Sequence, residues 1–151
     1  MKTYTVAILG ATGAVGQEMR KILEERDFPV GELRLLASAR SAGREVSFRG
    51  RTVTIREATE EAFQGVDLVL GAAENDIALR FAPAIRAAGA VFVDNSSAVR
   101  LNPQVPLVVP EVNGADALKN EGIVANPNCS TIITVTAVSY THLTLPTRIV
   151  V

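Results

Sequence analysis

Short aliphatic runs alternate with helix-like patterns along most of the chain. The runs that predict buried strands are Tyr4 to Leu9, Leu33 to Ala37, Val66 to Gly71, Ala90 to Val93 and Ile123 to Ala125. Helical spacing of apolar residues predicts helices through Met19, Ile22 and Leu23, over Asp76 to Ala88, over Ala115 to Lys119 and over Ser130 to Val138. Aliphatic strands that lack clean alternation and are separated by helices are typical of a parallel sheet covered on both faces. The pattern therefore predicts an α/β fold with a doubly wound, mostly parallel sheet.

The segment from Val46 to Ile55 has a different pattern. Apolar and polar residues alternate on both sides of Gly50-Arg51, as in two half-exposed strands joined by a tight turn. A hairpin is therefore expected here. Further along the chain, Gly89 lies where a stop signal for the helix over Asp76 to Ala88 is expected.

The composition fits one soluble domain and argues against several classes of function. The 151 residues include 15 Lys and Arg against 16 Asp and Glu, a net charge of −1 at pH 7, so there is no excess of basic charge for nucleic acid. The apolar runs are far shorter than the roughly 20 residues of a membrane-spanning helix, and no secretory segment opens the chain. A single cysteine cannot form an internal disulfide, which favours a reducing compartment and a cytoplasmic location.

Three glycines, Gly10, Gly13 and Gly16, lie between the first predicted strand and the first predicted helix. In such a turn, glycines bring backbone N–H groups close to a pyrophosphate at the helix N-terminus, where the helix dipole favours negative charge. The G-x-x-G-x-x-G spacing differs from the commoner G-x-G-x-x-G, so the motif alone is a weak signal. The alternative interpretation is a strand-to-helix turn that only needs a positive φ angle.

The end of the second predicted strand bears on this choice. NAD sites usually place an Asp or Glu there, which accepts hydrogen bonds from ribose hydroxyls. Residues 37–44 read Ala-Ser-Ala-Arg-Ser-Ala-Gly-Arg and contain no acid. A guanidinium and small hydroxyls, such as those of Arg40, Ser38 and Ser41, suit a 2′-phosphate instead, because Arg can pair bidentately with phosphate oxygens. The sequence therefore favours NADP over NAD, with a solvated basic loop as the alternative.

The only cysteine, Cys129, follows a predicted strand and an Asn-Pro-Asn turn and precedes a predicted helix. At a helix N-terminus the dipole favours a thiolate, and free N–H groups could stabilise an oxyanion on a bound carbonyl. A nucleophile is therefore plausible, and a small buried hydrophobe is the default alternative. No base accompanies the cysteine locally, because the only histidine, His142, lies close to the end of the chain.

A polar segment from Asp94 to Arg100 follows another buried strand. It should lie at the carboxyl edge of the sheet, where ligands of doubly wound folds bind. Arg100 could therefore hold an anionic group of a substrate. The simpler interpretation is that Asn95 and Ser96 form a turn and that Arg100 is a surface charge.

Five segments, taken in order, closely resemble the N-terminal part of the bacterial aspartate-semialdehyde dehydrogenase family. They are GATGAVG at 10–16, SARSAG at 38–43, DNSSA at 94–98 followed by Arg100, PLVVPEV at 106–112 and NPNCST at 126–131. The resemblance spans about residues 3–137, and five ordered motifs are far more specific than any single one. It implies a Rossmann-like NADP-binding domain over residues 1–138, which includes Cys129. It also implies an enzyme that converts L-aspartyl 4-phosphate to L-aspartate 4-semialdehyde and phosphate, a step shared by lysine, threonine and methionine synthesis.

The resemblance also implies a role for individual residues of these motifs. The residues that would bind the cofactor are Gly10, Thr12, Gly13, Ala14 and Val15 at the pyrophosphate, and Ser38, Arg40 and Ser41 at the adenosine 2′-phosphate. Arg100 would bind the substrate phosphoryl group or free phosphate, and Asn128 would help to position the intermediate. Cys129 would attack the acyl phosphate, and hydride from NADPH would reduce the resulting thioester. No metal site is implied.

Two segments depart from the family pattern. Residues 70–76 read LGAAEND, where many members have a Ser-Ala-Gly-Gly type of loop, so no contacts are transferred there. Residues 139–147 break the helical pattern and do not look like the family, although residues 148–151 could resemble the start of its next strand, so residues 139–151 suggest an anomalous tail from a truncated or spliced reading frame. On this interpretation the family's second domain, with its acid-base histidine and most of the dimer interface, is absent, and His142 does not replace that histidine.

The expected function is therefore that of a fragment. The chain should bind NADP and small-molecule substrates and should have little or no activity alone, and a homodimer is expected for the full-length family. One alternative is N-acetyl-gamma-glutamyl-phosphate reductase, which has a different sequence around its cysteine. The other is a non-catalytic NADP-binding module.

Overall fold

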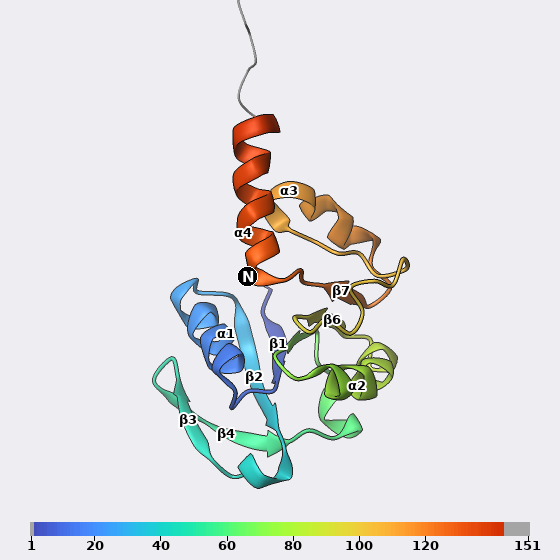
Figure 1. Cartoon of the computed structure of the whole chain (residues 1–151). Helices are drawn as coiled ribbons and strands as arrows, with labels where there is room; N and C mark the ends of the chain where they lie inside the picture. The colour runs from blue at the N-terminus through green and yellow to red at the C-terminus, as the bar shows by residue number, and fades with distance from the viewer. Residues whose placement is uncertain (1, 144–151) are drawn as a thin grey trace, which may run out of the picture.

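A seven-stranded sheet runs through the part of the chain that the computed structural model describes, residues 2–143 (Figure 1). The strands are β1 (Tyr4–Leu9), β2 (Val30–Ala37), β3 (Glu45–Phe48), β4 (Arg51–Glu57), β5 (Leu68–Gly71), β6 (Val91–Asp94) and β7 (Ile123–Ala125). Their order is β3-β4-β2-β1-β5-β6-β7, and every neighbouring pair is parallel except the β3–β4 hairpin. The predicted α/β fold with a mostly parallel sheet is therefore confirmed.

Helices cover both faces of this sheet. The α-helices are α1 (Ala14–Glu25), α2 (Asn75–Ala87), α3 (Pro110–Asn113) and α4 (Cys129–Val138), with 3-10 turns at Ala39–Ser41, Glu60–Phe63 and Gly114–Lys119. Successive side chains of a strand point to opposite faces. Accordingly, Val6 and Ile8 of β1 pack with Leu23 of α1, whereas Ala7 and Leu9 pack with the α2 side of the core.

The β3–β4 hairpin turns one residue earlier than the sequence predicts, at Arg49-Gly50 and not at Gly50-Arg51. Arg49 has φ 50° and Gly50 has φ 72°, the left-handed pair that a two-residue hairpin turn needs. Arg49 keeps this conformation because its backbone N–H donates to Glu24 Oε1 at 2.7 Å, and its guanidinium bonds the Phe28 carbonyl at 2.8 Å and Asp27 at 2.9 Å. The hairpin is thereby tied to the end of α1.

Other boundaries differ by a few residues. β2 begins at Val30, three residues before the predicted start, and β5 begins at Leu68, two residues after it. The predicted helix over Ala115 to Lys119 is part of a 3-10 turn that α3 precedes. Gly89 lies at the end of α2 with φ 78°, so the predicted stop signal is confirmed.

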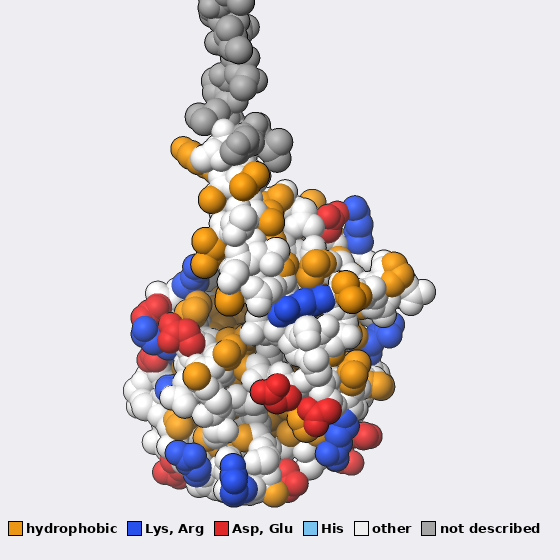
Figure 2. Space-filling model, viewed as in Figure 1, with side chains coloured by type: hydrophobic (Ala, Val, Ile, Leu, Met, Phe, Trp, Pro, Cys, Tyr) orange, Lys and Arg blue, Asp and Glu red, His pale blue; other side chains and the backbone are white. Residues whose placement is uncertain are grey.

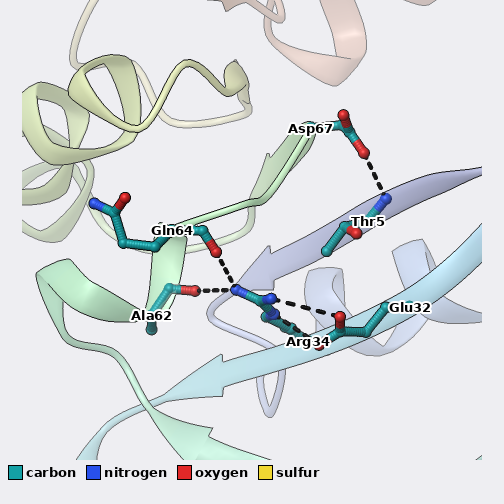
Figure 3. Close-up of polar contacts among 6 residues, drawn as sticks. All are labelled: Thr5, Glu32, Arg34, Ala62, Gln64 and Asp67. Atoms are coloured by element: carbon teal, nitrogen blue, oxygen red, sulfur yellow. Dashed lines mark hydrogen bonds and ion pairs between the residues drawn. The ribbon is translucent and has the colours of Figure 1, made fainter.

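Arg34, in the middle of β2, joins that strand to the segment that leads into β5 (Figure 3). Its guanidinium donates to the carbonyl oxygens of Ala62 at 3.1 Å and Gln64 at 2.7 Å, and its Nε donates to Glu32 Oε1 at 2.8 Å. The Arg34 side chain is only 19% exposed. Protein acceptors thus surround this cation, and its carboxylate partner balances its charge.

The carboxylates beside Arg34 are also engaged. The hydrogen bond from Arg34 holds the pKa of Glu32 below its ordinary value of 4.5. Asp67 accepts from the backbone N–H of Thr5 at 2.8 Å and donates its own N–H to the Thr5 carbonyl at 2.9 Å (Figure 3). The middle of β2 and the amino-terminal end of β1 are therefore fastened to the segment that leads into β5 by polar groups that satisfy one another.

Helix α4 projects from the body of the domain (Figure 1). None of its residues is buried, and hydrophobic side chains lie along its surface (Figure 2), with Ile133 72% exposed. Residues Ser139–Leu143 continue it as one π-helical turn, and residues 144–151 of the predicted tail lie outside the described residues. No helix among the described residues is both long and apolar enough to cross a membrane.

Candidate functional site

The glycine turn joins β1 to α1, and two of its glycines are required by the fold itself. Gly10 has φ 88°, and a Cβ there would lie 2.6 Å from the carbonyl oxygen of Ala72. A Cβ on Gly16 would lie 2.3 Å from the carbonyl oxygen of Gly10. Since any side chain would overlap backbone atoms at both positions, the need for a tight turn explains Gly10 and Gly16 without a ligand.

Gly13 has no such explanation. It is the N-cap of α1, with φ −72°, and the nearest atom to a Cβ placed there is 3.5 Å away. Helix α1 has no side-chain cap and no acidic residue in its first turn, and Ala14 and Val15 are exposed there. The first N–H groups of α1 are therefore open to an outside acceptor, and a helix N-terminus of this kind suits a phosphate.

A pocket of about 390 Å³ lies beside the turn. Its walls come from the ends of β1, β2 and β4 and from the beginning of α2, and they include Gly10, Ser38, Glu57, Ile77 and Phe81. This volume is within the usual range for a small-molecule site. A second cavity of about 400 Å³ lies between β2 and the hairpin, and it contains none of the predicted site residues.

Several residues of this pocket escaped the sequence interpretation. Glu57 ends β4, which lies next to β2, and Arg80 lies over the ring of Phe81 at 5.0 Å from its centroid. The second strand ends without an acid, whereas Glu57 reaches the pocket from the neighbouring strand β4. A sequence pattern alone does not reveal that β4 is the neighbour of β2.

Of the predicted 2′-phosphate residues, only Ser38 is part of the pocket wall. Arg40 and Ser41 follow on the 3-10 turn Ala39–Ser41. Arg40 is exposed, and it forms no hydrogen bond or ion pair with any described residue. The structure thus places Ser38 at the pocket and leaves the charge of Arg40 uncompensated nearby.

Arg100 lies at the carboxyl edge of the sheet, as predicted. Its Nε donates to the carbonyl oxygen of Asn126 at 2.9 Å, and its Nη2 donates to that of Asn95 at 2.8 Å. It is half-buried, and no carboxylate of the described residues pairs with it. Two backbone carbonyls therefore hold the Arg100 guanidinium in a fixed place.

The loop between β6 and Arg100 is built from short-range hydrogen bonds. Asp94 is fully buried, and its carboxylate accepts from the N–H of Ser96 at 3.0 Å and from its hydroxyl at 2.6 Å. Asn75, at the start of α2, accepts from the N–H of Ser97 at 3.0 Å. These bonds fix the loop against the sheet and against α2.

Cys129 is exposed and is the first residue of α4. Asn128 caps this helix, because its Oδ1 accepts from the N–H of Ser130 at 3.0 Å. The alternative of a buried cysteine is therefore wrong. No described side chain forms a hydrogen bond with the thiol, and nothing is described for the side chain of His142.

These residues form two groups along one edge of the sheet. The glycine turn and Ser38 follow β1 and β2, whereas Arg100 and Cys129 follow β6 and β7. The β5–α2 connection lies between them, with Ala72 against Gly10 on one side and Asn75 bonded to Ser97 on the other. The arrangement brings a glycine turn with a pocket, a held guanidinium and an exposed thiol to one edge of the sheet.

Comparisons with known proteins match most of this chain. The family model described as "Semialdehyde dehydrogenase, NAD binding domain" matches residues 5–121. The aspartate-semialdehyde dehydrogenase of Prochlorococcus marinus is 49% identical over 150 residues, which are 99% of this chain and 44% of that protein. The chain therefore spans less than half the length of this relative.

Solved structures give the same result. The crystal structure of aspartate semialdehyde dehydrogenase II from Vibrio cholerae, complexed with ASA, has a TM-score of 0.88 and 45% identity, covering 91% of this chain and 45% of that one. Aspartate semialdehyde dehydrogenase with NADP from Candida albicans has a TM-score of 0.73 and 28% identity, covering 89% and 45%.

Proposed function

The chain belongs to the semialdehyde dehydrogenase family, and from this premise we propose that it is the cofactor-binding, nucleophile-bearing part of an NADP-dependent aspartate-semialdehyde dehydrogenase. The observation that carries the proposal is the exposed thiol of Cys129 at the start of α4, three residues after the carbonyl that holds Arg100. A nucleophile beside an anion-binding cation suits an acyl phosphate, which has an electrophilic carbon next to a phosphoryl group. The names of the relatives indicate the four-carbon aspartyl substrate.

Cys129 acts first in the proposed reaction. Its thiolate attacks the acyl carbon of L-aspartyl 4-phosphate, a C–S bond forms, and the bond from that carbon to the phosphate oxygen breaks. Phosphate leaves with the electron pair, and the product on the enzyme is a thioester. The N-terminus of α4 favours the thiolate and the oxyanion of this step, since helix N-termini stabilise negative charge.

Arg100 binds the phosphoryl group in this proposal. Its Nη1 group and one N–H of Nη2 have no protein acceptor among the described residues, and Arg pairs well with two phosphate oxygens at once. Asn128 caps α4, so it positions Cys129 by fixing the first turn of that helix. We further propose that the full-length protein forms the homodimer expected for the family.

The cofactor in this proposal is NADP. Its pyrophosphate fits the open N–H groups at Ala14 and Val15, beside Gly13, and the uncompensated Arg40 with Ser41 suits the 2′-phosphate. The Candida albicans neighbour has NADP. When bound, NADPH supplies the hydride that converts the thioester to the aldehyde.

The experiment that tests the proposal measures nucleotide binding and thiol reactivity on the same preparation of the 151-residue chain. We expect NADPH to bind more tightly than NADH, and Arg40→Ala to weaken NADPH binding by about tenfold or more, since hydrogen bonds to charged groups contribute about 1.5–3 kcal/mol. Arg44→Ala is the matched control, because Arg44 is also exposed and unpaired among the described residues. Tighter binding of NADH by the parent chain would contradict the NADP assignment.

In the same preparation, iodoacetamide should label Cys129 faster in the folded chain than after unfolding in urea. Slower labelling of the folded chain would count against a nucleophile. We expect little or no phosphate-dependent oxidation of aspartate semialdehyde by this chain alone, because no described residue forms a hydrogen bond with the thiol as a base would. Full turnover would contradict that expectation.

A further inference from the structure

Three hydrogen bonds close a ring between the ends of β6 and β7. Arg100 Nε donates to the Asn126 carbonyl at 2.9 Å, and Arg100 Nη2 donates to the Asn95 carbonyl at 2.8 Å. The third bond joins the two asparagine side chains, from Asn126 Nδ2 to Asn95 Oδ1, at 2.6 Å. Both carbonyls that hold the guanidinium therefore belong to residues whose side chains are bonded to each other.

The backbone on each side of the ring is anchored to the sheet. The N–H of Asn126 donates to the Asp94 carbonyl at 2.8 Å, and the N–H of Asn95 donates to the Gly71 carbonyl at 3.2 Å. The loops that follow, one leading to Arg100 and the other to Cys129, then diverge. The bond between the asparagine side chains joins these two loops directly where they leave the strands, beside the two bonds of Arg100.

We propose that Asn95 and Asn126 are positioning residues that hold the Arg100 guanidinium at a fixed place beside the turn that carries Cys129. An oxyanion on Arg100 and an electrophilic carbon at Cys129 are then bound together, in a geometry set by the ring. This inference rests on the roles proposed above for Arg100 and Cys129. It adds that two neutral side chains, neither of which contacts the reacting atoms, determine how well the two groups act together.

The Arg100 charge lies close enough to Cys129 to alter the rate at which a charged reagent alkylates the thiol. Cys129 is three positions after Asn126, so their Cα atoms are at most about 10 Å apart, and the Arg100 guanidinium lies against the Asn126 carbonyl. A unit charge acting over about 10 Å alters a rate about 2- to 15-fold, depending on the local dielectric constant. The effect is measurable at low ionic strength, where exposed charges are least screened.

The probes are iodoacetate and iodoacetamide, which alkylate the thiolate by the same displacement of iodide and differ in one negative charge. Cys129 is the only cysteine of the chain, so the two rates report a single atom. The quantity measured is the rate with iodoacetate divided by the rate with iodoacetamide, for the folded chain relative to the chain in urea. Inorganic phosphate is then added as a competitor of iodoacetate.

We expect the parent chain to favour iodoacetate about 2- to 15-fold over the unfolded chain, and Arg100→Ala to remove this preference. Asn126→Ala and Asn95→Ala should each lower the preference towards that of Arg100→Ala and weaken protection by phosphate. The double variant should lose no more than either single variant, because both act through one bond. NADPH binding and the iodoacetamide rate should stay close to those of the parent.

Asn120→Ala is the matched control, because Asn120 also uses both side-chain groups, to the Ala117 carbonyl and the Gly122 N–H, at the amino end of β7. It should lose stability without losing the preference for iodoacetate. Circular dichroism and Tm establish that each variant is folded. If Asn126→Ala does not fold, Asn126→Ser, whose side chain is one bond shorter, takes its place.

Two results would overturn the proposal in distinguishable ways. A parent-like preference in folded Asn126 and Asn95 variants, together with its loss in Arg100→Ala, would refute the positioning role and leave the proposed function intact. An unchanged preference in Arg100→Ala would refute the anion site itself, and the positioning role with it. Additive losses in the double variant would show that the asparagines do not act through their mutual bond.

Discussion

Arg34 and Arg100 occupy opposite situations in the same sheet. Arg34 bonds two carbonyl oxygens and also pairs with the Glu32 carboxylate, so its charge and its donors are satisfied within the protein (Figure 3). Arg100 bonds two carbonyl oxygens as well, but no carboxylate of the described residues balances it. Arg34 therefore stabilises the fold, whereas Arg100 is held in place by the fold and keeps an uncompensated charge that a ligand can bind.

The same contrast holds within the glycine turn, and it gives the largest expected effect. A Cβ at Gly16 would meet the Gly10 carbonyl oxygen at 2.3 Å, whereas nothing lies within 3.5 Å of a Cβ at Gly13. We therefore expect Gly16→Ala to cost more than about 4 kcal/mol of the free energy of unfolding, and Gly13→Ala to change it by less than about 1 kcal/mol. Urea unfolding measures both.

Gly13→Ala should fold normally but should bind NADPH less tightly. Gly13→Ala should weaken NADPH binding by at least about tenfold, since a pyrophosphate must approach the backbone closely at this turn. Fluorescence titration with NADPH measures the loss. Parent-like affinity in Gly13→Ala would mean that this glycine is not left open for a ligand.

The second prediction compares substitutions of the two arginines. Arg34→Ala should lower the free energy of unfolding by about 2–4 kcal/mol, because it removes charge-assisted bonds from two carbonyls on a mostly buried side chain. Arg34→Lys keeps the charge but lacks the planar fork, so its loss should be intermediate. We expect inorganic phosphate to raise the Tm of the parent chain. Arg100→Ala should cost less stability than Arg34→Ala and should abolish this rise.

Thermal unfolding with and without phosphate measures both effects in one series. The decisive comparison is the size of the phosphate-induced shift in Arg34→Ala, which should equal that of the parent. If Arg34→Ala lost this shift while Arg100→Ala kept it, the division of roles between the two arginines would be reversed.

The smallest effect concerns Glu32. Its pKa is lowered from 4.5 by the hydrogen bond from Arg34, so its contribution to stability is present above about pH 4.5 and is lost as the pH falls through the lower folded value. Because the side chain is 52% exposed, this contribution should be less than about 1 kcal/mol. Glu32→Gln should make the decline of the urea midpoint between about pH 5 and pH 3 shallower. An unchanged decline would assign it to other carboxylates.

The sequence pattern correctly predicted those features of the fold that depend on residues close together in the chain. The aliphatic runs predicted β1 and β7 with their observed limits, and the Asn-Pro-Asn turn correctly placed Cys129 at a helix N-terminus. The Arg49-Gly50 turn was predicted one residue late because Gly50 suggested the turn, whereas Arg49 takes a positive φ only with the support of α1.

What the sequence did not predict depends on contacts between distant residues. Glu57 and Phe81 reach one pocket because β4 lies beside β2 and α2 covers the adjoining face. Asn95 and Asn126 are 31 residues apart, and each resembles an ordinary turn former in isolation. The order of the strands in the sheet determines such contacts, and the hydrophobic pattern of a single strand does not indicate which strands lie next to it.

The Gly10 turn has a consequence for the kinetics of folding. The N–H groups of Gly10 and Ala11 both donate to the Leu36 carbonyl on β2, and the Gly10 backbone lies against Ala72 after β5. Among the described strand pairs, only the β3–β4 hairpin can close locally, and it lies at the sheet edge. Parallel pairing of distant segments is slow, because each pair must first close a long loop. The turn therefore acquires its shape only after three distant strands have assembled, so the ability to bind a nucleotide should arise late in folding.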